Sequence, residues 1–297
     1  MFSGIWLPLV TPFQSGKIDV DALQKLTERY AQTGISGFVV LGTTGEAALL
    51  SEIERVTVLQ AVTEVVTNRL PVLVGVGGLA TRDFVREVHR YDHWDVSGYL
   101  VSAPAYLCPD QAGLLWHFEQ VARATQRHVV LYDVPHRTGV GIEADTVRRL
   151  SELVNVTGIK ACAPERFDAF GKLSIDMLCG TDHAYPECTA AGGVGGILAS
   201  AHVCADLLLS VQALSQTGQH AAARSLFDQL RPIIDLLFST PNPSSIKAML
   251  ALDGSIRDET RMPITPVSPK QVTRLERARI ELESIRMHAT ANAEHLA

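Results

Sequence analysis

Long apolar runs, paired cysteines and an excess of charge of one sign are all missing from this chain. No stretch of about 18 consecutive apolar residues occurs, so we expect no membrane span. The apolar N-terminal stretch follows no basic segment and is interrupted by prolines, which argues against a signal peptide. The 5 cysteines are odd in number and form no CxxC or Cys/His cluster with zinc spacing. The sequence therefore predicts a cytoplasmic protein with reduced thiols and no structural metal.

Charge is nearly balanced and dispersed along the chain. Lys and Arg number 26, Asp and Glu 32, and the net charge is −6 without a basic stripe. This pattern excludes nucleic acid as an expected partner and is typical of a soluble enzyme. With 297 residues, 46% of them hydrophobic, the chain can bury a substantial core, and α/β barrels of this length are single domains.

Eight short apolar runs recur along the first two thirds of the chain. They are continuous rather than alternating, which is typical of strands buried on both faces of a parallel sheet. The predicted strands are Ile5–Val10, Gly37–Leu41, Val72–Val76, Gly98–Ser102, Val129–Tyr132, Val156–Lys160, Met177–Gly180 and Gly195–Leu198.

A helical pattern follows each predicted strand. Ser51 and Glu54 have the spacing of a capping box at the start of the second helix. Eight strands that each precede a helix predict an α/β fold, the (β/α)8 TIM barrel, over an open doubly wound sheet, because no early GxGxxG opens a first helix. The predicted helices are Asp19–Thr33, Ser51–Thr67, Thr81–Tyr91, Pro109–Thr125, Glu143–Leu153, Pro164–Leu173, Tyr185–Ala191 and Val203–Gln216.

Three further helical stretches, Gln219–Leu236, Ser244–Leu252 and Pro269–Met287, follow the complete barrel. We expect a barrel over 1–218 and a C-terminal helical extension over 219–297 packed on it. The alternatives are an independent domain and, for the final residues, disorder.

Two reactive side chains stand at the carboxyl ends of predicted strands, where TIM barrels place their active sites. Lys160 ends one strand and Tyr132 ends the preceding one. Lysine is costly to bury, and desolvation lowers its pKa and makes the amine nucleophilic toward a ketone. The pair therefore suggests Schiff-base chemistry, although Lys160 could extend to solvent and Tyr132 could be a core tyrosine.

Other strand ends carry polar residues that suit an anionic substrate. The Gly42–Glu46 loop, GTTGE, could cradle a carboxylate with its amides and two threonine hydroxyls, or be a simple turn. Arg137 could clamp a carboxylate or be a surface charge. Asp182 lacks a second carboxylate beside it, and His183 and His202 lack partners at metal spacing, so we expect neither a metal nor a nucleotide.

In combination, three motifs resemble the dihydrodipicolinate synthase and N-acetylneuraminate lyase family of class I pyruvate-dependent aldolases. They are GTTGE at 42–46, YDVPHRTG at 132–139 and GIK at 158–160. The resemblance implies the barrel, the C-terminal helices, small-molecule substrates (pyruvate and an aldehyde), and a homotetramer or homodimer. It also implies a covalent Schiff base between pyruvate and Lys160, with no other cofactor.

The resemblance further implies a catalytic role for each matched residue. Tyr132 would shuttle protons during imine formation and enamine attack. Thr43 would relay protons between Tyr132 and Tyr106, which would enter from a neighbouring subunit.

The substrate-binding residues also follow from the resemblance. Thr44 and Gly42, with the loop backbone, would hold the pyruvate carboxylate, and Ile197 would line the pyruvate site. Arg137 would bind the acceptor carboxylate at the pocket mouth.

The arginine at 137 favours the synthase branch of the family. That branch condenses pyruvate with aspartate 4-semialdehyde to 4-hydroxytetrahydrodipicolinate, on the lysine and diaminopimelate pathway. Asp133, His136 and Ala161 depart from the family pattern around the acceptor. Two alternatives therefore remain: a pyruvate-dependent lyase or dehydratase acting on a sugar acid, and a silent barrel that binds a keto acid. Ala105 stands where lysine-inhibited members have tyrosine, so we expect weak or absent inhibition by lysine.

Overall fold

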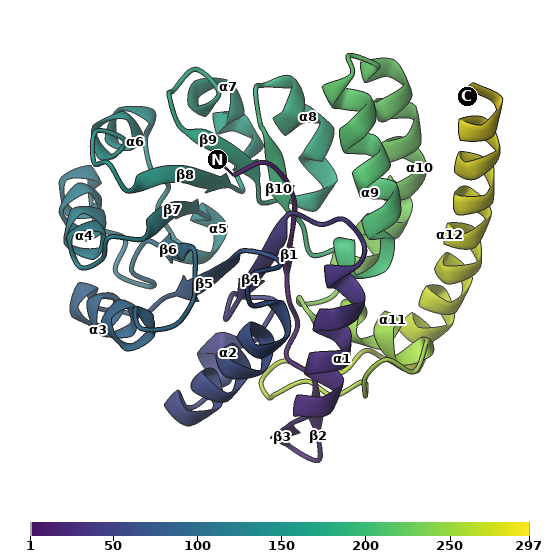
Figure 1. Cartoon of the computed structure of the whole chain (residues 1–297), viewed down its shortest axis with the longest axis horizontal. Coiled ribbons are helices and arrows are strands. Elements are labelled where there is room, and N and C mark those ends of the chain that lie inside the picture. Colours follow the sequence, from purple (N-terminus) through teal and green to yellow (C-terminus); the bar gives the residue numbers. More distant parts are fainter. Residues whose placement is uncertain (1, 297) are drawn as a thin grey trace.

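Eight parallel strands close into a barrel in the computed structural model, which describes residues 2–296 and the side chains of 2–289 (Figure 1). Around the barrel the order is β1-β10-β9-β8-β7-β6-β5-β4, with β4 paired to β1. The predicted (β/α)8 architecture is confirmed. The strands are β1 (Gly4–Pro8), β4 (Gly37–Val40), β5 (Val72–Val76), β6 (Gly98–Ser102), β7 (His128–Asp133), β8 (Val156–Ala161), β9 (Asp176–Cys179) and β10 (Gly195–Ile197).

A small antiparallel hairpin, β2 (Phe13–Gln14) with β3 (Lys17–Ile18), was not predicted. Its turn residues Ser15 and Gly16 have φ of 52° and 74°, the left-handed conformation of tight hairpin turns. Each of its strands has only two residues, too few to produce a recognisable pattern in the sequence.

The helices that alternate with the strands follow the prediction closely. The capping box is present: the Ser51 hydroxyl accepts from the Glu54 amide at 3.3 Å, and Glu54 Oε2 accepts from the Ser51 amide at 2.8 Å. The helices are α1 (Val20–Ala31), α2 (Glu52–Val66), α3 (Thr81–Tyr91), α4 (Gln111–Arg123), α5 (Pro135–Thr138), α6 (Ala144–Leu150), α7 (Phe167–Phe170), α8 (Tyr185–Ala190) and α9 (Ala201–Gln216).

The predicted helix at 164–173 is wrong in extent. A 3-10 turn at Pro164–Arg166 precedes the four residues of α7, and the helix stops at Gly171. A Cβ on Gly171 would collide with the Ala191 carbonyl, so the chain is held against its neighbour at that point. The four-residue helix α5 was also not predicted.

The barrel interior is filled rather than open. One apolar cluster inside it combines side chains from successive strands, and Tyr132 packs against this cluster from above. The packed interior leaves the strand ends as the place where this barrel can hold a ligand. The cluster consists of Phe2, Trp6, Val39, Leu73, Leu100, Val130, Leu178 and Ile197.

The C-terminal helices α10 (His220–Phe238), α11 (Ser244–Leu252) and α12 (Pro269–Leu296) pack against the barrel side at α9 (Figure 1). Side chains from these helices and from the barrel belong to one continuous apolar cluster. The backbone is helical to Leu296, past the predicted end at Met287. The division of the chain into a barrel over 1–218 and a C-terminal helical extension over 219–297 stays a prediction.

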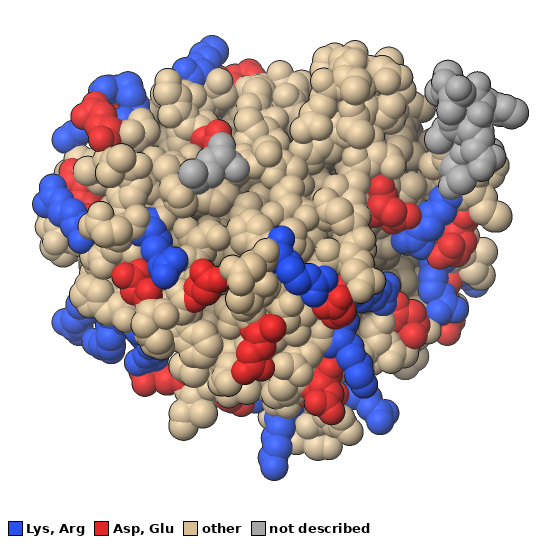
Figure 2. Space-filling model, in the orientation of Figure 1, with Lys and Arg blue, Asp and Glu red and all other residues tan. Residues whose placement is uncertain are grey.

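Figure 2 shows acidic and basic side chains interspersed over the left, lower and right parts of the face shown. None of the described helices is both long and apolar enough to cross a membrane.

Candidate active site

A cavity of about 400 Å³ lies at the carboxyl ends of the barrel strands. Its apolar floor includes Val39, Leu100 and Ile197 of the interior cluster, and its walls are polar. The cavity lies at the strand ends where the sequence predicts the site, and its lining includes Gly42, Thr43, Thr44, Tyr132, His136, Arg137, Lys160, Cys162, Gly180, Thr181, Asp182, His183, Phe238 and Asn242.

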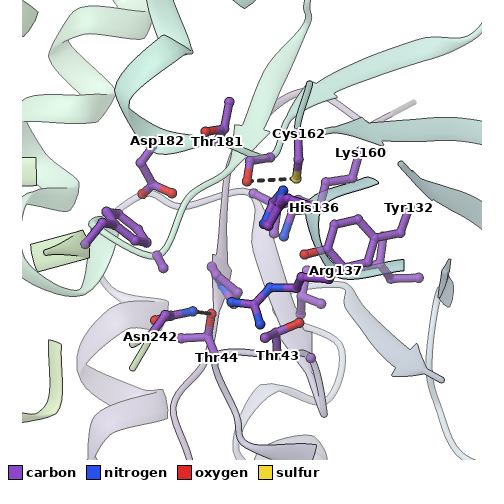
Figure 3. Close-up of a pocket in the computed structure, with 18 of the residues that line it drawn as sticks. Thr43, Thr44, Tyr132, His136, Arg137, Lys160, Cys162, Thr181, Asp182 and Asn242 are labelled. Carbon is purple, nitrogen blue, oxygen red and sulfur yellow. Dashed lines mark hydrogen bonds between the residues drawn. The ribbon is translucent and has the colours of Figure 1, made fainter. Parts of the chain in front are cut away.

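Lys160 and Tyr132 enter this cavity from neighbouring strands (Figure 3). They are register partners on β8 and β7, so the parallel ladder sets them side by side. Lys160 Nζ lies 4.5 Å from the centroid of the Tyr132 ring, and Lys160 is only 7% exposed. Lys160 therefore does not extend to solvent; its amine is confined beside a phenol in a cavity.

Two opposing effects set the pKa of Lys160. Burial lowers it, but the interactions of the amine with Tyr132, Cys162 and Asp182 together outweigh burial, and the pKa lies above its ordinary value. The lowered pKa expected from the sequence is therefore wrong for the free protein. Lys160 is an ammonium at neutral pH and must lose a proton before it can attack a ketone.

Tyr132 places a phenol, which is a proton donor when neutral, beside this amine. Burial raises its pKa, while the positive charge of Lys160 and a side-chain interaction with Thr43 lower it. The phenol is therefore protonated at neutral pH but is placed where a cation and a hydroxyl stabilise its anion.

The Gly42–Glu46 loop is held closed by its own backbone. The amides of Gly45 and Ala47 donate to the Gly42 carbonyl at 3.1 and 3.5 Å, and the Glu46 amide donates to the Thr43 carbonyl at 3.1 Å. These amides are thus engaged within the loop. A substrate carboxylate would meet Thr43 and Thr44, which line the cavity.

Helix α5 places Arg137 and His136 at the cavity mouth, where both are exposed. The Arg137 side chain extends over the cavity in Figure 3. Partial desolvation of the ring, and then the neighbouring charge of Arg137, lower the pKa of His136. The guanidinium is thus the cation at the mouth that could pair with an anionic substrate group.

Asp182 is a buried residue of the cavity that the sequence does not mark as functional. It is 5% exposed, and its Oδ1 accepts from the Ser200 amide at 2.7 Å. Burial raises its pKa, against hydrogen bonds from Ser200 and the charge of Lys160. The sequence shows only that Asp182 lacks a second carboxylate beside it, whereas its charge acts on the Lys160 amine, which comes from another strand.

Cys162 and Asn242 also line the cavity without having been predicted. The Cys162 thiol donates to the Gly180 carbonyl at 3.1 Å, and burial raises its pKa to about 12. Asn242 comes from the C-terminal segment, and its Nδ2 donates to Thr44 Oγ1 at 3.0 Å. No sequence signal links two residues so far apart in the chain.

Tyr106 lies outside the cavity of its own chain and is 88% exposed. It adopts a φ of 72°, and the apolar side chains of Ile53, Leu79 and Leu107 are also exposed. A relay from Thr43 to Tyr106 is therefore not formed within one chain. Within residues 2–289, no group of three or more His, Cys, Asp or Glu side chains could hold a metal ion.

Known proteins are similar to this chain in both sequence and fold. The model of the dihydrodipicolinate synthetase family matches residues 1–281. The 4-hydroxy-tetrahydrodipicolinate synthase 2 of Clostridium acetobutylicum is 37% identical over 89% of this chain and 95% of that protein. The corresponding synthase of Magnetococcus marinus is 36% identical over 95% of this chain and 98% of its own.

Solved structures agree with these sequence relatives. The 4-hydroxy-tetrahydrodipicolinate synthase of Methylacidiphilum fumariolicum SolV superposes with a TM-score of 0.93, at 29% identity over 100% of this chain and 99% of that chain. The dihydrodipicolinate synthase of Thermotoga maritima has a TM-score of 0.92, at 32% identity over 95% and 99% of the two chains. The chain therefore belongs to the dihydrodipicolinate synthetase family.

Proposed function

We propose that the chain is a 4-hydroxy-tetrahydrodipicolinate synthase that condenses pyruvate with aspartate 4-semialdehyde through a Schiff base on Lys160. The observation that carries the proposal is the Lys160 amine 4.5 Å from the Tyr132 ring centroid, in the cavity at the strand ends. Family membership supports the reaction, and relatives at this level of identity carry the synthase name.

The first stage is formation of the Schiff base. Lys160 loses a proton to solvent, and its neutral amine attacks the ketone carbon of pyruvate. A proton then passes from the new C–N nitrogen to the former ketone oxygen, which gives a neutral carbinolamine. The neutral phenol of Tyr132 donates its proton to the departing hydroxyl and becomes a phenolate, water leaves, and a protonated imine remains on the lysine. Asp182, buried in the same cavity, offsets the positive charge of that imine.

The second stage forms the carbon–carbon bond. Loss of a methyl proton converts the imine to an enamine, and its carbon attacks the aldehyde carbon of the acceptor. The aldehyde oxygen takes up a proton as the new bond forms, and Tyr132 is placed to carry protons in both steps.

Substrate anions would be held at two places. Thr43 and Thr44, with Gly42 beside them, would hold the pyruvate carboxylate deep in the cavity, while Ile197 covers the apolar side of the keto acid. Arg137 would pair with the acceptor carboxylate at the mouth. Two anion sites fit a reaction between two substrates that each carry a carboxylate.

We further propose that the active unit is at least a homodimer, with a homotetramer as the fuller assembly. The exposed residues Tyr106, Leu107 and Leu79 support this, since monomers rarely expose neighbouring large apolar side chains. A neighbour's Tyr106 would complete the proton relay that starts at Thr43.

A sugar-acid aldolase is the second candidate. Asp182 and Thr181 line the cavity beside Lys160, and these groups would accept and donate hydrogen bonds to hydroxyls of a longer substrate. Such an enzyme would share the Lys160 chemistry and differ only in the acceptor.

The test is turnover of pyruvate and aspartate 4-semialdehyde by the purified protein, with dihydrodipicolinate reductase reporting the product. We expect turnover that is lost in Lys160→Ala and kept in Lys172→Ala, an exposed lysine elsewhere on the barrel. Borohydride should trap pyruvate on Lys160. Trapping without turnover would reject the synthase in favour of a sugar-acid aldolase, and an absence of trapping would reject both enzymes.

A further inference from the structure

A buried ion pair connects the C-terminal helices to the Gly42–Glu46 loop. Lys247 of α11 and Glu46 are both 0% exposed at their side chains, and Nζ lies 2.5 Å from Oε1. Lys247 Nζ also donates to the Glu259 carbonyl at 2.8 Å and lies 4.0 Å from the centroid of the Phe13 ring. Two charges removed from water are costly, and good geometry with additional hydrogen bonds is what offsets that cost.

Glu46 is the last residue of the loop and is fixed in an unusual conformation. Its φ of 54° lies in the left-handed region, which residues other than glycine seldom adopt. Its amide donates to the Thr43 carbonyl at 3.1 Å, and its Oε2 accepts from the Arg261 amide at 2.8 Å. The side chain is therefore held by Lys247 and Arg261 while its backbone closes the loop around Thr43.

A second contact from the same C-terminal segment reaches the middle of the loop. Asn242, just before α11, donates to Thr44 Oγ1 at 3.0 Å (Figure 3). Residues 242–261 thus contact the loop at Thr44, which lines the cavity, and at Glu46, two residues further along the chain. Displacement of Glu46 would move the backbone that orients Thr43 and Thr44.

We propose that Lys247 and Glu46 are positioning residues: their buried ion pair fixes the loop conformation that gives Thr43 and Thr44 their grip on the keto-acid carboxylate. Neither residue contacts the substrate in this proposal. The kinetic part of this inference rests on the proposed function, whereas the structural part does not.

The experiment compares three variants of the full-length protein. Lys247→Met removes one charge and leaves Glu46 buried without its counter-charge. Glu46→Gln/Lys247→Met removes both charges and keeps similar shapes, which relieves the unpaired charge. Arg279→Met is the matched control, because it removes a contact from Arg279 to the Leu252 carbonyl within the C-terminal helices, at 2.8 Å, away from the loop.

Three quantities are measured: the melting temperature, deuterium exchange of the peptide covering 42–50, and the KM for pyruvate. We expect Lys247→Met to lower the melting temperature by about 10 °C. The double variant should recover most of this loss, yet both variants should show faster exchange of the loop and a KM raised about tenfold. Arg279→Met should change neither the exchange of the loop nor the KM.

A double variant with wild-type stability, exchange and KM would overturn the proposal, because the pair would then only compensate its own charges. The proposal is equally overturned if Lys247→Met folds and keeps wild-type exchange and KM. If Lys247→Met does not fold, the loop exchange and the KM of the double variant decide whether the proposal stands. If the wild-type protein is not trapped by pyruvate, the proposed function fails, and loop exchange still decides whether the pair positions the loop.

Discussion

Lys160 and Tyr132 are paired in register on the adjacent strands β8 and β7, with the amine 4.5 Å from the ring centroid. A parallel ladder fixes this spacing through backbone hydrogen bonds rather than through flexible loops. Both groups are therefore held before any substrate arrives, which reduces the entropy cost of a reaction between them and a bound ketone.

Tyr132→Phe should slow turnover about a hundredfold while leaving the fold intact, since it removes a proton carrier but keeps the ring that packs on the interior cluster. Turnover and borohydride trapping measure this. Tyr185→Phe, at a buried tyrosine that hydrogen bonds Gln212 at 3.1 Å, is the control and should retain activity. Wild-type turnover in Tyr132→Phe would remove Tyr132 from the proton transfers.

Gly180→Ala should impair activity without unfolding the barrel. A Cβ at this position would lie 2.7 Å from Lys160 Cγ and 2.9 Å from Cε, and would also collide with the Cys162 thiol. We expect the lysine to be displaced and kcat to fall about tenfold or more. Gly77→Ala, where the nearest atom would be Ser102 Oγ at 3.9 Å, should be nearly neutral. Equal rates in both variants would contradict the tight packing around Lys160.

The pH dependence of kcat/KM for pyruvate should change when the charge of Asp182 is removed. Its negative charge helps to raise the pKa of Lys160, and removing an anion makes an ammonium easier to deprotonate. Asp182→Asn should therefore shift the rise of kcat/KM for pyruvate toward lower pH. Asp168→Asn, at an exposed carboxylate on α7, should leave the profile in place. A shift to higher pH would show that Asp182 does not act through its charge.

Tyr106 should affect turnover only in the active site of a partner subunit. It is 88% exposed and outside its own cavity, so Tyr106→Phe should reduce turnover if, and only if, a neighbour's site uses it. Mixing Tyr106→Phe with Lys160→Ala subunits should then restore part of the activity in mixed dimers. Sedimentation of the same samples reports their assembly. Full activity in a protein that sediments as a monomer would contradict the shared site.

Lysine should inhibit the enzyme weakly or not at all. In the cavity next to the active site, Glu87 is already engaged by Arg55 at 3.1 Å and by Arg90 at 2.9 Å, so this carboxylate is neutralised within the chain. Turnover measured against lysine concentration tests this. Inhibition at micromolar lysine would show that the carboxylate is free to bind an added amine.

The sequence predicted the barrel because its strands and helices leave local signals. Continuous apolar runs such as Val72–Val76 need burial on both faces, and the Ser51–Glu54 capping box marks the start of a helix. The strand-end positions of Lys160 and Tyr132 followed from the same runs, and barrel topology gathers such ends on one face.

What the sequence could not supply depends on distances between segments far apart in the chain. The contact of Asn242 with Thr44, the burial of Lys247 against Glu46 and the place of Asp182 near Lys160 have no local pattern. The sign of the Lys160 pKa shift is of this kind. Burial alone, which an apolar run indicates, would lower the pKa, whereas Tyr132 and Asp182, which help to raise it, come from other strand ends. The sequence by itself thus determined which elements form and which residues end them, because those follow from local burial. Only the tertiary structure decided which charges meet, because electrostatic energy depends on separation in space.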